Sequence, residues 1–214
     1  MELTEPLAPQ SGERDTRLLA AQLELLAGVV AGHALQPSLE ELLRVVEQVS
    51  ASRLLASVLL LDDEGKRLLH GAAPSLPADY NEAIHGVEIG PNVGSCGTAA
   101  FRRNQVIVTD IRTDPLWTDF RDLAEAAGLR ACWSTPILGA GGRVLGTFAM
   151  YYPQPSSPTP ADFALIDVLV RSVAMAIERS RLDEQREREL AEERALGLTF
   201  QFSLLPEIPD RLGE

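Results

Sequence analysis

The chain has 214 residues, a formal net charge of −12 and a hydrophobic fraction of 45%. This length suits one packed domain with additional helices, and the mean hydropathy of +0.01 is that of a globular protein. The negative charge argues against nucleic acid and anionic membrane surfaces as partners, because both would repel it. No apolar run is long enough to span a bilayer. The two cysteines form no CxxC pair, so we expect a cytoplasmic protein without a disulfide framework.

The N-terminal quarter of the chain predicts a disordered start followed by two helices. Residues 1–13 are rich in Pro, Ser, Gly and Glu, a composition that predicts disorder. Leucines and valines then recur at helical spacing, so residues 14–37 are expected to form an N-terminal helix and its connection. Ser38 and Glu41 have the spacing of a capping box, which predicts the start of a second helix.

The middle of the chain predicts strands joined by short turns. The segment SVLLLDDEGKRLLHGAA (57–73) predicts two strands that flank a turn at Asp63-Glu64-Gly65. A short helix is expected over 79–84 with Asp79 as its cap, and a strand over 106–111.

The next segments predict a helix and a hairpin. Residues 114–128 (DPLWTDFRDLAEAAG) predict a helix that ends at Gly128. Two strands, 131–139 and 143–152, flank the pair Gly141-Gly142, which suits the positive φ angles of a hairpin turn.

The last third of the chain predicts one long helix. Thr159, Pro160 and Asp162 supply an N-cap, a first-turn proline and a first-turn acid. The helix is apolar on one face as far as Ile177 and charged nearly all round beyond it, with an interruption expected at Gly197. The whole pattern predicts an α+β domain with a mostly antiparallel sheet, helices on its faces and helices at both ends.

Several strings in this order resemble the second half of a GAF domain: GPNVGSCGTAAFRRNQVIVTDI, DPLW, GLRACWSTPI and GGRVLGTFAMYY. The resemblance implies a GAF sensory domain over residues 38–180, with a central antiparallel sheet, helices on both faces and a ligand cavity on one face. It also implies long N- and C-terminal helices of the kind that often pair with a second subunit. We therefore expect a homodimer that forms through the terminal helices.

A second, shorter resemblance lies at the end of the chain. ERALGLTFQFSLLPEIPDRLGE (193–214) resembles the segment that opens bacterial partner-switching serine phosphatases, which dephosphorylate anti-sigma-factor antagonists. Phe202 stands where that family usually has arginine, and Ile208 where it usually has leucine. The resemblance implies a charged connector helix over 181–200 and the start of a phosphatase-like output domain over 201–214. Because that family's catalytic aspartates lie farther downstream, we expect no enzymatic activity from this chain.

Cys96 is the residue on which a catalytic interpretation would depend. GSCGTAA also resembles the matching stretch of free methionine-R-sulfoxide reductases, GAF enzymes with a reactive cysteine there. Their chemistry needs a second cysteine in a GHIACD-type segment, whereas Cys132 lies in RACWSTPI without that His and Asp. The sequence therefore predicts no resolving thiol for a sulfenic acid on Cys96. We interpret Cys96 as a small pocket or turn residue, and Cys132 as a buried residue facing away from Trp133.

No cofactor is predicted. Neither cysteine stands beside a histidine, as bilin attachment would require, and no His, Cys, Asp and Glu residues have zinc-site spacing. His85 is the best placed histidine for haem, but a single loop histidine is most often a surface residue. The NKFDE-like motif of cyclic-nucleotide GAF domains is absent from the sequence.

The sequence predicts a ligand pocket and leaves three hypotheses for the function. The candidate lining residues are Cys96, Thr98, Trp117, Phe120, Trp133, Thr135 and Thr147. The leading hypothesis is a GAF sensory module that binds an unidentified small molecule and relays its state through the C-terminal helix to an attached output domain. The alternatives are an enzyme of the methionine-sulfoxide reductase type and a ligandless GAF dimerisation domain. The sequence does not separate the sensor from the ligandless domain, since an empty cavity and a ligand site have the same pattern.

Overall fold

The computed structural model describes residues 11–50 and 53–203. In this part of the chain, six strands form one sheet in the order β3-β2-β1-β6-β5-β4, and every pair of neighbours is antiparallel. The strands are β1 (Leu55–Leu61), β2 (Arg67–Ala72), β3 (Val87–Glu88), β4 (Val106–Val108), β5 (Ala131–Leu138) and β6 (Val144–Tyr152). The α+β class with a central antiparallel sheet, predicted from the sequence, is confirmed.

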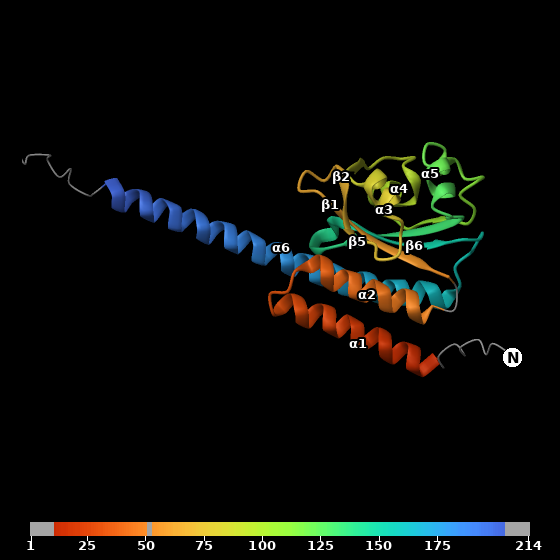
Figure 1. Cartoon of the computed structure of the whole chain (residues 1–214), viewed down its shortest axis with the longest axis horizontal. Helices are drawn as coiled ribbons and strands as arrows, with labels where there is room; N and C mark the ends of the chain where they lie inside the picture. The colour runs from red at the N-terminus through yellow and green to blue at the C-terminus, as the bar shows by residue number, and fades with distance from the viewer. Residues whose placement is uncertain (1–10, 51–52, 204–214) are drawn as a thin grey trace, which may run out of the picture.

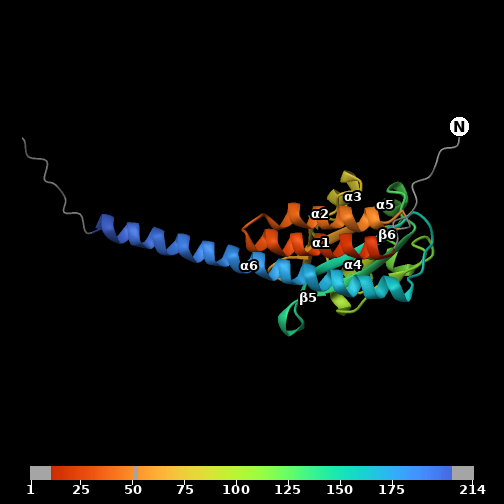
Figure 2. The same ribbon diagram turned by 90° about the horizontal axis from the view of Figure 1, so that it is seen from below.

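Helices cover both faces of the sheet (Figure 1). The helical elements are α1 (Ser11–Val30), α2 (Leu35–Val49), α3 (Ala78–Ile84), α4 (Gly94–Arg102), η1 (Pro115–Trp117), α5 (Arg121–Ala126), η2 (Ala140–Gly142) and α6 (Pro160–Ser203). Helices α1, α2 and α6 lie side by side on one face, as Figure 2 shows, while α3, α4 and α5 lie on the other. Helix α6 extends far beyond the sheet. No helix among the described residues is both long and apolar enough to cross a membrane.

Helix α1 ends in a left-handed turn at Gly32, which has a φ of +86°. The N–H of Gly32 bonds to Val29 O at 3.1 Å and that of His33 to Gly28 O at 2.9 Å, which is a Schellman motif. The helix begins at Ser11, so the predicted disorder of residues 1–13 is wrong for 11–13. Residues 1–10 lie outside the described part.

Helix α2 begins at Leu35, earlier than the capping box predicted. Pro37 fits in the first turn, where backbone N–H groups have no intrahelical acceptor in any case. Ser38 therefore lies inside the helix, and its Oγ donates to Ala34 O at 3.1 Å. The predicted pairing of Ser38 with Glu41 at the helix start is wrong.

Both predicted hairpins are confirmed. In the β1–β2 turn, Asp62 Oδ1 accepts the N–H of Lys66 at 2.7 Å and that of Arg67 at 3.1 Å. These bonds, that of Lys66 above all, lower the pKa of the Asp62 carboxyl. In the β5–β6 connection, Gly141 and Gly142 have φ angles of +69° and +75°, as their sequence predicted.

Two predictions on the α4–β5 side need correction. The helix predicted over 114–128 is split into η1 and α5, because Phe120 leaves the helical region with φ −117° and ψ 1°. The strand predicted over 106–111 pairs with β5 over Val106–Val108 alone. Gly128 does end the helical stretch, with a φ of +72°.

Helix α6 starts with the predicted cap. Thr159 N donates to Asp162 Oδ2 at 2.8 Å, and Asp162 N donates to Thr159 Oγ1 at 3.3 Å. The helix then continues to Ser203 through Gly197, so the predicted interruption there is wrong. One glycine costs a helix about 1 kcal/mol, which does not end it when its neighbours are good helix formers. Residues 204–214, the last part of the phosphatase-like segment, lie outside the described residues.

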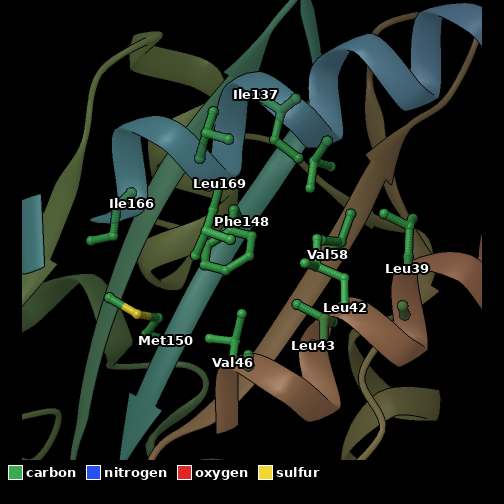
Figure 3. Close-up of a cluster of buried hydrophobic side chains, with 14 of the residues drawn as sticks. Leu39, Leu42, Leu43, Val46, Val58, Ile137, Phe148, Met150, Ile166 and Leu169 are labelled. Carbon is green, nitrogen blue, oxygen red and sulfur yellow. The ribbon is translucent and has the colours of Figure 1, made fainter. Parts of the chain in front are cut away.

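The core between the sheet and helices α2 and α6 is built of apolar side chains. Figure 3 shows Phe148 and Met150 of β6 facing Val46 of α2 and Leu169 of α6, and all are buried. Burial of such a side chain contributes about 1.5–3 kcal/mol. Because side chains alternate along a strand, Ala149 and Tyr151 face the other side of the sheet. A second core therefore lies under α3, α4 and η1.

Candidate functional site

The second core encloses a small pocket of about 40 Å³. Its wall is mainly apolar and combines strands of the sheet with α3, the start of α4 and η1: Leu59, Leu68, Tyr80, Ile84, Val87, Val93, Gly94, Ser95, Cys96, Gly97, Trp117, Phe120 and Tyr151. A volume of this size holds a few water-sized groups. The pocket as it stands therefore fits a molecule of a few atoms.

Two glycines bring the start of α4 close to the pocket. Gly94 has a φ of +52°, and a Cβ there would lie 3.7 Å from the Trp117 ring. A Cβ on Gly97 would lie 2.7 Å from Val93, which is closer than side chains approach. The GSCG turn thus needs its glycines for conformation and close packing, and it sets Cys96 in the first turn of the helix.

Ser95 connects α4 to both walls of the pocket. Its Oγ accepts a hydrogen bond from Trp117 Nε1 and donates one to the backbone carbonyl of Cys132, each at 3.1 Å. All three residues are buried. The bonds fix the turn of α4 between η1 and strand β5.

The structure brings the two cysteines together. Cys96 in α4 and Cys132 in β5 are both free and lie near each other: Cys96 Sγ is 3.6 Å from Tyr151 OH, and Tyr151 lies directly opposite Cys132 where β6 pairs with β5. Cys132 faces the pocket side because it alternates with Trp133 along β5, as predicted. The sequence predicted no resolving thiol for Cys96, and the structure places Cys132 near enough to be a candidate for that role. The two residues are far apart in sequence, and the packing of α4 on β5 brings them together.

The environment of Cys96 favours the thiolate. The interaction with the Cys132 side chain lowers the pKa of Cys96 most, and burial acts in the opposite direction. The hydroxyls of Ser134, Tyr151 and Thr147 lower it further, so that the pKa of Cys96 is about 6. Burial, followed by the interaction with Cys96, raises the pKa of the Cys132 thiol well above its ordinary value. The pair thus consists of one ionisable thiol and one that stays protonated.

The hydroxyl groups around Cys96 are poorly satisfied by the rest of the protein. Tyr151 OH lies 3.6 Å from Cys96 Sγ and 3.4 Å from Ser57 Oγ. Ser134 Oγ and Thr147 Oγ1 are fully buried and lack a hydrogen-bond partner of good geometry, although both lie near the Cys96 sulfur. Buried hydroxyls without partners are costly, so these groups are available to donate to an anion at that position.

Some of the predicted lining residues meet in the pocket and others do not. Cys96, Trp117 and Phe120 belong to its wall. Trp133 and Thr135 lie on the opposite face of the sheet, which α2 and α6 cover, since residues alternate along β5.

Thr98 and Thr147 also lie outside the wall. The hydroxyl of Thr98 accepts the Val93 N–H at 3.1 Å, and Thr147 lies near the Cys96 sulfur. The sequence prediction missed Tyr80 and Tyr151, whose rings contact edge to face with centroids 6.0 Å apart. Pairing the predicted strands in register would have placed Tyr151 opposite Cys132.

The structure places the histidine that the sequence singled out for haem beside strand β2. His85 Nδ1 accepts the backbone N–H of His70 at 3.1 Å, and His85 does not belong to the pocket wall. No group of three or more His, Cys, Asp and Glu side chains gathers among residues 11–50 and 53–203. The pocket chemistry consists of thiols, hydroxyls and apolar groups.

Comparison with known proteins identifies the domain. The family model described as GAF domain matches residues 33–178. The methyl sulfide methyltransferase-associated sensor of Methanosarcina acetivorans is 37% identical over 161 residues, which cover 75% of this chain but 16% of that protein. The chain thus spans a small fraction of the length of this relative.

Solved structures agree on the fold. The GAF domain of a phosphoenolpyruvate-protein phosphotransferase from Coxiella burnetii has a TM-score of 0.63 at 16% identity, covering 79% of this chain and 98% of that one. The free methionine-R-sulfoxide reductase from Neisseria meningitidis, in complex with its substrate, has a TM-score of 0.62 at 16% identity, covering 85% and 98%. With the family model matching most of its length, the chain belongs to the GAF domain family.

Proposed function

We propose that this chain is a sensory module whose pocket receives a small molecule and whose helix α6 relays the change to an attached output domain. The observation that carries this proposal is the double role of strand β6. Tyr151 of this strand forms part of the pocket wall, while its neighbours Met150 and Phe148 pack on the opposite face among residues of α2 and α6. A ligand that shifts the strand from one side therefore acts on the helices through the other.

Two contacts with the domain allow helix α6 to transmit such a shift. Near the point where it leaves the domain, the Glu178 carboxylate accepts the Ala140 N–H at 2.7 Å and Arg181 donates to the carbonyl of Leu61. Beyond Arg181, most side chains up to residue 195 are exposed, and the helix stands free of the domain (Figure 1). Pairs such as Arg188 with Glu184 support it there by about 0.2–0.5 kcal/mol each.

The relative that is named a sensor supports a sensory role for this domain. For the output domain we propose a serine phosphatase of anti-sigma-antagonist pathways, on the resemblance of residues 193–214 to the opening segment of those enzymes. The two unpaired thiols suit the reducing cytoplasm, where we propose that the module acts.

We also propose that the module works as a homodimer through α1 and α6. Leu19 and Leu23 of α1 are more than half exposed at 58% and 59%, and they are four residues apart on one helix face. On α6, Val168, Met175 and Leu182 are likewise exposed and recur every seven residues, which is the spacing of a coiled-coil seam. Since α1 packs on α6, the two exposed sets belong to neighbouring helices.

Native mass spectrometry of the protein purified from its own cells tests the pocket. We expect a small molecule bound to the wild type and lost in Val87→Phe, which fills the pocket from its edge strand. The matched control is Ile107→Phe, the same enlargement at a partly exposed position of β4 away from the pocket. Hydrogen exchange of α6 with and without that molecule then tests the relay. A wild type that carries no molecule, and whose α6 exchange is unchanged in Val87→Phe, would favour a ligandless dimerisation domain.

A second candidate function is reduction of free methionine-R-sulfoxide. The adjacency of Cys96 and Cys132 favours it, as does the fold shared with the reductase from Neisseria meningitidis. Thioredoxin-coupled consumption of NADPH with this substrate, lost in Cys96→Ser, would establish that function. No turnover above the rate of Cys96→Ser would exclude it.

A further inference from the structure

We propose that Cys96 and Cys132 form a hydroperoxide-sensitive pair, in which Cys96 is oxidised first and then closes an intramolecular disulfide with Cys132. The inference rests on the proposed sensory function, since it names a class of signal that the same pocket would receive. It is carried by the position of both cysteines beside Tyr151, the hydroxyls around Cys96 and the small volume of the pocket.

The position of Cys96 makes it the reactive thiol. It forms part of the pocket wall and is partly accessible, so a small oxidant that enters the pocket reaches its sulfur. It lies in the first turn of α4, where free N–H groups and the helix dipole favour an anion. The hydroxyls of Ser134 and Thr147, unpartnered elsewhere, and that of Tyr151 lie around the sulfur. These groups stabilise a thiolate without any nearby cation.

Cys132 has the properties of a resolving thiol. It is fully buried, and its raised pKa keeps it protonated and unreactive toward an oxidant in solution. It lies opposite Tyr151, whose hydroxyl is 3.6 Å from Cys96 Sγ, and its carbonyl accepts the hydroxyl of Ser95, the residue before Cys96, so a sulfenic acid on Cys96 forms near it. Closure requires the first turn of α4 to move toward β5, and Ser95 already connects these two elements.

The chemistry balances with a hydroperoxide as the two-electron oxidant. The Cys96 thiolate attacks the terminal peroxide oxygen, an S–O bond forms, the O–O bond breaks, and the departing alkoxide or hydroxide takes a proton from water. The Cys132 sulfur then attacks the Cys96 sulfur, an S–S bond forms and the S–O bond breaks. The departing hydroxide takes the Cys132 proton and leaves as water. Both thiols are oxidised, and the peroxide is reduced to an alcohol or water.

The size of the pocket favours a peroxide over a larger oxidant. A volume of about 40 Å³ accepts hydrogen peroxide directly, whereas an amino acid sulfoxide would require side chains of the wall to move. Disulfide closure would shift Cys96, Ser95 and the Trp117 ring that Ser95 holds, so oxidation would change the pocket wall itself. Because Tyr151 of β6 belongs to the same wall, oxidation of the thiols would change the contacts of that strand.

Intact-mass measurement of the folded chain treated with one equivalent of hydrogen peroxide tests the proposal. The wild type should lose two hydrogen atoms, and peptide mapping without reductant should link the peptides of Cys96 and Cys132 within one subunit. In Cys132→Ala, where Cys96 has no resolving partner, the intact mass should rise by one oxygen atom, and peptide mapping should place that oxygen on Cys96. In the matched variant Cys96→Ala, the remaining thiol should stay unmodified. Circular dichroism checks that both variants are folded.

Three outcomes would overturn the proposal: thiols that stay reduced in the folded wild type, a sulfenic acid that persists beside Cys132, or a disulfide between subunits. Free methionine sulfoxide is a parallel arm of the experiment. Oxidation of the pair by the sulfoxide but not by peroxide would assign the thiols to the reductase function instead. Because the readout is the state of two sulfurs, it is independent of ligand binding and of α6. A failed relay test and a failed oxidation test are therefore distinguishable.

Discussion

Trp117 Nε1 donates a hydrogen bond of 3.1 Å to Ser95 Oγ, and this bond joins the element η1 to the first turn of α4. Both side chains are buried, with exposures of 3% and 0%. The indole N–H has no access to water there, so the serine hydroxyl is part of the pocket's framework.

We predict that Ser95→Ala destabilises the protein by about 1–3 kcal/mol, because it leaves the Trp117 N–H and the Cys132 carbonyl without this partner. Urea denaturation followed by circular dichroism measures the change. Ser57→Ala is the control, since the Ser57 hydroxyl contacts Tyr151 OH at 3.4 Å and Tyr151 keeps its contact with Cys96. A loss in Ser95→Ala no larger than that in Ser57→Ala would contradict the role given to Ser95.

The environment of Cys96 predicts a particular pH dependence of alkylation. Only the thiolate reacts with iodoacetamide, so the rate at Cys96 should rise with pH, reach half its maximum near pH 6 and level off above it. In Cys132→Ala the half-point should move to higher pH, because the interaction that lowers the pKa of Cys96 most is removed. Peptide mass spectrometry quantifies labelling at each pH. A half-point at the ordinary thiol value of 9.0 in the wild type would show that the hydroxyls do not stabilise the anion.

Most of the sheet could be predicted from the sequence, because its signals are local. The alternation within β5 and the positive φ angles at Gly141 and Gly142 depend on a few neighbouring residues, and the structure has both. Helix boundaries were less accurate. Pro37 stands in the first turn of α2, where its missing N–H costs no helical hydrogen bond, and Gly197 stands inside α6, because one glycine costs a helix only about 1 kcal/mol.

The pocket could be predicted only in part, because it depends on contacts between distant segments. Cys96 and Trp117 were found because they follow recognisable turns, whereas Tyr80 and Tyr151 reach the pocket from α3 and β6. The alternation of side chains along β5, which places Cys132 on the pocket face, would have excluded Trp133 from the predicted pocket. The Trp133 indole donates instead to Ser156 O at 3.1 Å.

The exposed leucines of α1 predict a dimer that one charge can weaken. Wild-type protein at micromolar concentration should have the mass of a dimer in multi-angle light scattering, and Leu23→Glu should weaken association at least tenfold, because a carboxylate would be buried without a partner. Phe101→Glu is a matched control, since Phe101 is 53% exposed and Leu23 is 59% exposed. A monomeric wild type, or equal weakening by Phe101→Glu, would contradict an interface on α1 and α6.

The last prediction concerns Arg181, whose side chain ties α6 to the backbone of β1 at the point where the helix leaves the domain. A hydrogen bond from a charged donor to a carbonyl contributes about 1.5 kcal/mol, which is roughly a tenfold change in a local opening equilibrium. In Arg181→Ala, amide hydrogen exchange around residues 178–190 should therefore become about tenfold faster, while the sheet stays protected.

Arg188→Ala is the control for this experiment, because it removes an exposed pair with Glu184 that is worth only about 0.2–0.5 kcal/mol. Its exchange should rise by less than threefold. Mass spectrometry of deuterated peptides from the three proteins gives the comparison. If Arg181→Ala and Arg188→Ala behave alike, Arg181 does not hold the start of the free helix. The part of α6 beyond Arg181 would then be a solvated connector, and a shift of β6 would reach the helix through its contacts upstream, such as that of Glu178 with the Ala140 N–H.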